Sequence, residues 1–97
     1  MPTVLDEKQI EKALQSLHGW EIRDGKLHKD FVLPDFKQAM AFMVRVGFEA
    51  EALQHHPEFH NVYNWVSIDL ATHDADDQVT DSDTALAAKI EAIAPAK

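Results

Sequence analysis

Apolar residues in the first third of the chain recur first at helical and then at extended spacing. A predicted amphipathic helix has an apolar face made of Ile10, Ala13, Leu14 and Leu17. Asp6 and Gln9 match a capping box at its start, and Gly19 is expected to end it. The pair Asp24-Gly25 lies between two short runs and predicts a β-hairpin. Its strands are expected near residues 20–23 and 26–33.

A second, longer amphipathic helix is predicted from residue 36 to about Gln54. Asp35 follows Pro34 and is expected to cap this helix. The predicted apolar face contains Phe36, Met40, Met43, Gly47 and Ala50. Pro57 cannot continue the helix, and it disfavours helical backbone at the residue before it. The adjacent residues His55 and His56 are therefore expected where the helix ends.

Residues 61–73 alternate between two sets of positions, which predicts one long strand with one buried face. The first set is Val62, Asn64, Val66, Ile68, Leu70 and Thr72, and the second is Tyr63, Trp65, Ser67, Asp69, Ala71 and His73. The acidic stretch 74–83 is predicted to be a loop. A last helix then places Leu86, Ile90 and Ile93 on one face before Pro95.

The order helix, strand, strand, helix, strand, helix predicts an α+β fold. Hairpin strands beside a third strand favour an antiparallel sheet with helices packed on one face. The strand count stays open between three and four, because residues near 76–80 could add a short edge strand. A chain of 97 residues has room for one hydrophobic core, so residues 1–97 are predicted to form a single domain.

The composition of the chain excludes or disfavours several classes of function. Apolar residues make up 45% of the chain and charged residues 27%, as in ordinary folded proteins. The chain has no cysteine, which excludes disulfides and thiolate chemistry. Its net charge of -8 disfavours binding to nucleic acid or anionic membranes. No signal-like start and no apolar run of about 18 residues is present, so we predict a soluble, cytoplasmic protein.

Histidines are the main candidates for chemistry, because imidazole exchanges protons near neutral pH. His55 and His56 follow a helix and His73 ends a strand, where side chains can converge on a cleft. Glu51 lies one helical turn before His55 and is expected to orient that imidazole. The other three histidines, His18, His28 and His60, look like turn or surface residues.

Two other interpretations of the histidines stay open. Histidines in a loop can simply be solvated and have no role. Three histidines with a carboxylate could also bind zinc, although two of them are adjacent and no known ligand spacing is present. We rank the zinc site below acid–base chemistry and predict no metal site.

The run "EAEALQHHPEFHNVYNWVSIDLATHD" and the later "DTALAAKIEAIA" closely resemble the pterin-4a-carbinolamine dehydratase family. "GWEI" and "FKQAMAFMVRVGFEAE" extend the resemblance over nearly the whole chain. The resemblance implies an α+β sandwich with a four-stranded antiparallel sheet, assembled as a homodimer or homotetramer. Two departures from relatives are the acidic segment after the Thr-His pair, where many carry a glycine-containing turn, and Phe59, which is often tryptophan.

The resemblance also implies an activity and a site. Family members convert 4a-hydroxytetrahydropterin to quinonoid dihydropterin and water, so that a reductase can recycle the cofactor, in tetrahydrobiopterin-type recycling. The pterin is the substrate, and no other cofactor is expected. The implied catalytic residues are His55, His56 and His73; the implied substrate-binding residues are Glu51, Trp20, Ala71 and Thr72. We expect His55 and His73 to act as the acid–base pair and His56 mainly to bind.

Two alternative functions follow from the same resemblance. Animal members of the family also act as dimerisation partners and coactivators of a homeodomain transcription factor. A protein of this fold could instead serve a pterin pathway connected with molybdopterin.

Overall fold

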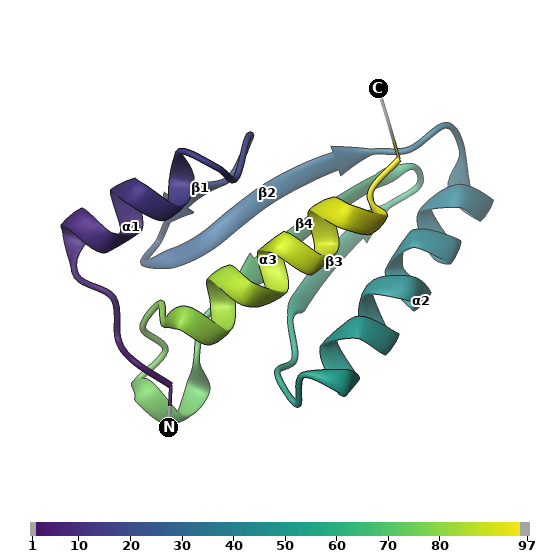
Figure 1. Cartoon of the computed structure of the whole chain (residues 1–97). Helices are drawn as coiled ribbons and strands as arrows, with labels where there is room; N and C mark the ends of the chain where they lie inside the picture. The colour runs from purple at the N-terminus through teal and green to yellow at the C-terminus, as the bar shows by residue number, and fades with distance from the viewer. Residues whose placement is uncertain (1, 96–97) are drawn as a thin grey trace.

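A four-stranded antiparallel sheet with three α-helices on one face makes up the computed structural model, which describes residues 2–95 (Figure 1). The strands, in the order β1-β2-β4-β3, are β1 (Glu21–Arg23), β2 (Lys26–Val32), β4 (Trp65–Leu70) and β3 (Glu58–Val62). The helices are α1 (Glu7–Leu14), α2 (Phe36–Ala52) and α3 (Asp81–Ile93). The predicted fold class is confirmed. No helix within residues 2–95 is long and apolar enough to cross a membrane.

The first helix and hairpin form largely as predicted. The Asp6 side chain accepts from the Gln9 amide, and the Gln9 side chain accepts from the Asp6 amide, both at 2.8 Å. This capping box satisfies two amides that the first helical turn leaves unpaired. Helix α1 nevertheless ends at Leu14, well before Gly19, because the chain continues in a series of turns. Asp24 and Gly25 adopt positive φ and close the β1–β2 hairpin.

The prediction of one long strand over residues 61–73 is wrong. The chain forms a second hairpin, in which Val62 pairs with Trp65 across a two-residue turn. Tyr63 is the first residue of that turn and has a φ of +50°, a backbone conformation that glycine and asparagine adopt much more readily than tyrosine. The fourth strand is therefore residues 58–62 and not the segment 76–80, which forms only isolated bridges.

Helix α2 is confirmed, but its buried face differs from the prediction. The buried residues are Ala39, Phe42, Val46 and Ala50. Phe36 and Met40, which were expected in the core, are exposed. Ala50 of the predicted face is buried and Met43 packs against the core, so the prediction was wrong only for Phe36 and Met40. Apolar side chains surround more of this helix than its buried face requires, so spacing alone does not select that face. The result is an exposed apolar row along α2, which we call the α2 stripe: Phe36, Met40, Val44 and Phe48.

The core lies between the sheet and helices α2 and α3 (Figure 1). Leu86 and Ile90 of α3 are fully buried in it, as the predicted stripe requires, and Ile93 packs at its margin. Residues of β4 alternate, with Val66, Ile68 and Leu70 fully buried. This packing brings the end of α2, the end of β4 and the start of α3 together at one end of the core.

Candidate active site

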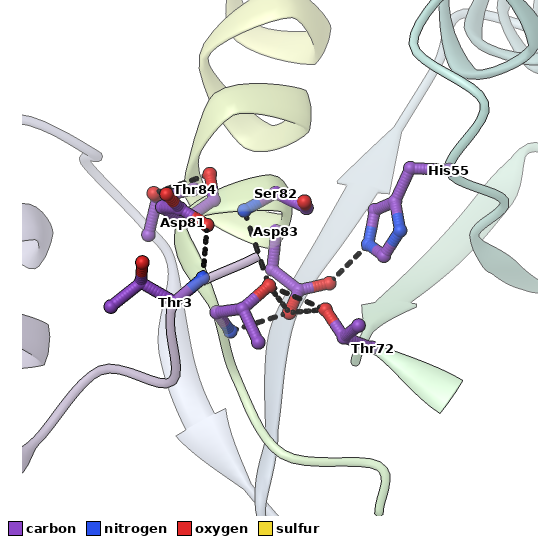
Figure 2. A network of polar contacts seen from close by, with 8 residues as sticks. Thr3, His55, Thr72, Asp81, Ser82, Asp83 and Thr84 are labelled. Atoms are coloured by element: carbon purple, nitrogen blue, oxygen red, sulfur yellow. Dashed lines mark hydrogen bonds and ion pairs between the residues drawn. The ribbon is translucent and has the colours of Figure 1, made fainter. Parts of the chain in front are cut away.

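A buried carboxylate, Asp83, connects the three elements that meet at this end of the core. One of its oxygens, Oδ1, lies 2.5 Å from Nε2 of His55. The other, Oδ2, accepts from the Thr72 hydroxyl at 2.9 Å and from the Thr80 amide at 2.8 Å. Figure 2 shows the His55 imidazole and the Thr72 hydroxyl pointing at the same carboxylate. Asp83 is wholly inaccessible to solvent, and both of its carboxylate oxygens accept hydrogen bonds.

Helix capping explains why Asp83 is at this point. Thr80 is the N-cap of α3, and its amide donates to Asp83 in a capping box. The Thr80 hydroxyl accepts from the Ser82 amide and lies 2.5 Å from the Thr72 hydroxyl. Thr80 and Asp83 were not predicted as site residues, because residues 74–83 were expected to form a loop. The signal was present: a threonine followed three positions later by an acidic residue before an apolar run.

His55 is turned inward by the way α2 ends. Gln54 adopts a left-handed conformation with a φ of +52°, and the His55 amide donates to the Ala50 carbonyl at 3.0 Å. The His55 side chain is only 12% exposed. Because a carboxylate can only accept, the Nε2 atom that faces Asp83 carries a hydrogen. In the neutral imidazole, Nδ1 is then the basic nitrogen.

His56 points away from Asp83 and pairs with Glu51. Its Nε2 lies 2.8 Å from Glu51 Oε1, and both side chains are largely exposed. The hydrogen bond from His56, followed by that from Gln54, lowers the pKa of Glu51 below its ordinary value of 4.5. Glu51 was predicted to orient His55 and instead contacts His56, because the turn at Gln54 directs His55 towards α3.

The segment directly after β4 contributes Ala71, Thr72 and His73. Thr72 is buried, its amide donates to the Gln78 carbonyl at 2.9 Å, and its hydroxyl joins Asp83. His73 begins a short 3-10 helix, His73–Ala75, and its side chain is 94% exposed. Its Nδ1 lies 3.4 Å from Asp77. Asp83 thus joins His55 to the residue before His73, whereas no hydrogen bond among residues 2–95 joins the side chains of any two of the three histidines.

Trp20 lies elsewhere in the core. Its ring packs edge-on against Phe31, and its Nε1 donates to Glu91 of α3 at 3.0 Å. Glu91 is eight residues after Asp83, or about 12 Å along the helix axis. No contact within the described residues links Trp20 to the histidines, so its role in substrate binding stays a prediction.

His28 was interpreted as a turn or surface residue, and this was wrong. It lies in β2, is buried, and its Nδ1 is 2.7 Å from Asp69 of the neighbouring strand. The residues paired with His28 on the neighbouring strands, Glu21 and Asp69, lie beside it on the sheet face that carries no helices. Within residues 2–95 no group of three or more histidine and acidic side chains is placed to hold a metal ion.

Comparison with known proteins identifies the family. The model of the family described as pterin 4 alpha carbinolamine dehydratase matches residues 3–93. The chain belongs to this family. A relative from Opitutus terrae that carries the family's name is 48% identical over 96% of each chain, and one from Solibacter usitatus is 46% identical over 97% of this chain and 98% of its own.

A solved structure supports the fold as well as the family. The crystal structure of a transcriptional coactivator/pterin dehydratase from Brucella melitensis superposes with a TM-score of 0.89 and is 40% identical. The match covers 96% of this chain and all of that one. Asp83 joins two segments on which the sequence resemblance to the family rested, around His55-His56-Pro57 and Thr72-His73.

Proposed function

We propose that this protein removes water from a 4a-hydroxytetrahydropterin and yields quinonoid dihydropterin. Membership of the dehydratase family supports the substrate class. The observation that carries the proposal is the bond from His55 to a buried carboxylate that also holds Thr72, the neighbour of His73. Asp83 thereby ties an oriented imidazole to the residue before a second, accessible imidazole, and such a pair is suited to acid–base chemistry.

The reaction needs one proton delivered and one removed. The bond between C4a and the hydroxyl oxygen breaks as an acid protonates that hydroxyl, which leaves as water. A ring nitrogen loses its proton to a base, and its electron pair forms the new double bond to C4a. No redox step is involved, and the product is one that a reductase can return to the tetrahydropterin.

The geometry favours a division of roles among the three histidines. His55 serves as the base, because Asp83 holds the hydrogen on Nε2, leaves Nδ1 to accept, and stabilises the imidazolium that forms. His73, whose side chain is 94% exposed, serves as the acid. The exposed pair of His56 and Glu51 holds the substrate.

The test measures decay of the 4a-carbinolamine by stopped-flow absorbance without added metal. A folded variant with His55→Ala and His73→Ala is expected to lose about 100-fold or more of the catalysed rate. His18→Ala, which removes an exposed histidine outside the site, is the matched control and should keep the rate. A double variant with the native circular dichroism spectrum and the full rate would contradict the proposed roles.

The α2 stripe favours a second role, association with protein. Phe48 is 72% and Val44 53% exposed, although both are apolar. Contiguous exposed apolar side chains on a helix are typical of an interface. We propose that the stripe joins copies of this chain into a homodimer or homotetramer. The solved relative from Brucella melitensis is named a coactivator as well as a dehydratase, so a foreign protein partner is the second candidate.

A further inference from the structure

Helix α1 and strand β1 lie together at one edge of the sheet (Figure 1), and they line an apolar groove whose lining includes none of His55, His56 and His73. Its volume is about 510 Å³, within the range of small-molecule pockets. The apolar lining is Ile10, Leu14, Trp20 and Ile22, and the acidic lining is Glu7, Glu11 and Glu21. Trp20 is the one lining residue with a predicted role in substrate binding. The other lining residues take no part in the proposed catalytic contacts.

Strand β1 is an edge strand, and its backbone offers a free donor and acceptor beside the groove. Arg23 pairs with Lys26 across the two-residue hairpin turn, so these two residues exchange hydrogen bonds. Hydrogen-bonded and non-bonded pairs alternate in an antiparallel ladder. Ile22, paired with Leu27, is therefore the residue of β1 whose N–H and C=O point to the open edge. Among residues 2–95 no group bonds to them.

The charge around the groove selects the kind of ligand. Glu7, Glu11 and Glu21 belong to no ion pair among residues 2–95, and the whole chain carries a net charge of -8. Three carboxylates around an apolar floor attract a cationic group and repel an anionic one. Like many edge strands, β1 is short, and a short edge limits aggregation through strand pairing. Its open side can still pair with one strand of a partner.

We propose that the groove binds an extended, basic segment of a partner protein by adding a strand to β1. In this arrangement an apolar residue of the segment lies opposite Ile22 and exchanges both backbone hydrogen bonds with it. Side chains of opposite residues share one face of a sheet, so that apolar side chain enters the groove beside Ile22. Lysine or arginine two positions away on either side lies on the same face and reaches the glutamates of α1.

The probe is a blocked pentapeptide of sequence KTLTK, added to the full-length, ¹⁵N-labelled protein. We expect saturable shifts at the amides of Ile10, Leu14 and Ile22, weakening as added salt screens the glutamates. The charge-reversed peptide ETLTE should not bind. Methylation of the leucine nitrogen removes the bond to the Ile22 carbonyl and should weaken binding at least tenfold. Absence of saturation up to about 1 mM, or equal binding of the methylated peptide, would overturn the proposal.

Two protein variants separate this groove from the active site and from self-association. Ile22→Lys places a cation at the groove and should abolish peptide binding while leaving the dehydratase rate unchanged. Val32→Lys makes the same change at another exposed strand position and should bind normally. If instead Ile22→Lys altered the self-association of the protein, the groove would be an interface for a second copy. That result would also refute the proposal.

Discussion

Asp83 shows how a single buried residue can serve both a helix and a site. Its carboxylate accepts from an amide of its own helix, from a hydroxyl at the end of β4 and from an imidazole after α2. Hydrogen bonds to charged groups are stronger than neutral ones, and each donor here would be costly to leave unpaired. The bonds that cap α3 therefore also fix the orientation of His55.

Asp83→Asn is expected to destabilise the protein by about 1–3 kcal/mol, because the amide NH₂ must face a donor that the carboxylate satisfied. Urea denaturation measures the loss. Asp81→Asn is the matched control: this residue is in the same helical turn but exposed, where its bond to the Thr3 amide contributes less. Equal midpoints for the two variants would show that Asp83 is not the structural link described above.

His56→Ala is expected to raise the pKa of Glu51 towards 4.5, because the main cause of the lowered pKa is the hydrogen bond from His56. A carboxyl group whose pKa is lowered by folding stabilises the folded state above its unfolded pKa, and this contribution is lost as pH falls through the lowered value. Carboxyl ¹³C titration by NMR measures the shift. His60→Ala leaves the pair intact and should not move it; a Glu51 titration unaffected by His56→Ala would refute the assignment.

At the scale of elements, helix caps and tight turns could be predicted from the sequence, whereas the side of a helix that is buried could not. The capping box of α1 and the Asp24-Gly25 turn rest on hydrogen bonds and φ preferences among neighbours, and both formed. The burial of Ala39 and Phe42 instead of Phe36 and Met40 depends on how α2 packs on β4 and α3, which spacing does not contain. The contact between His55 and Asp83 joins residues far apart in sequence, so only the fold reveals it.

The β3–β4 turn was missed because Tyr63 occupies a position where side chains with a Cβ are disfavoured. Tyr63→Asn should stabilise the protein by up to about 1 kcal/mol, since asparagine tolerates left-handed backbone better. Thermal unfolding measures this gain. Tyr63→Ala removes the same exposed ring without relieving the backbone and should not stabilise. Identical effects of the two substitutions would indicate that the turn stores no such strain.

The whole molecule presents distinct surfaces at separate places. His55 and His56 lie where α2 ends and His73 follows β4, the acidic groove lies between α1 and β1, and the α2 stripe runs along the exposed side of α2. Helix α2 thus contributes to the core, to the site through Glu51, and to an outward apolar face. An interface formed by α2 would bury the stripe and leave both the groove and the accessible ring of His73 outside that helix face.

Phe48→Lys tests the interface at the scale of the assembly. In a twofold contact the same side chain appears on both copies, so each dimer would bury two lysines where it had buried two phenylalanines. We expect the dissociation constant to rise at least tenfold, which size-exclusion chromatography with light scattering can follow over a range of concentrations. Gln38→Lys adds the same charge to α2 away from the stripe and should leave the assembly intact. Because Phe48 takes part in none of the Asp83 bonds, the folded monomer should retain His55 in place. An unchanged oligomer would mean that the stripe is covered by something other than a second copy.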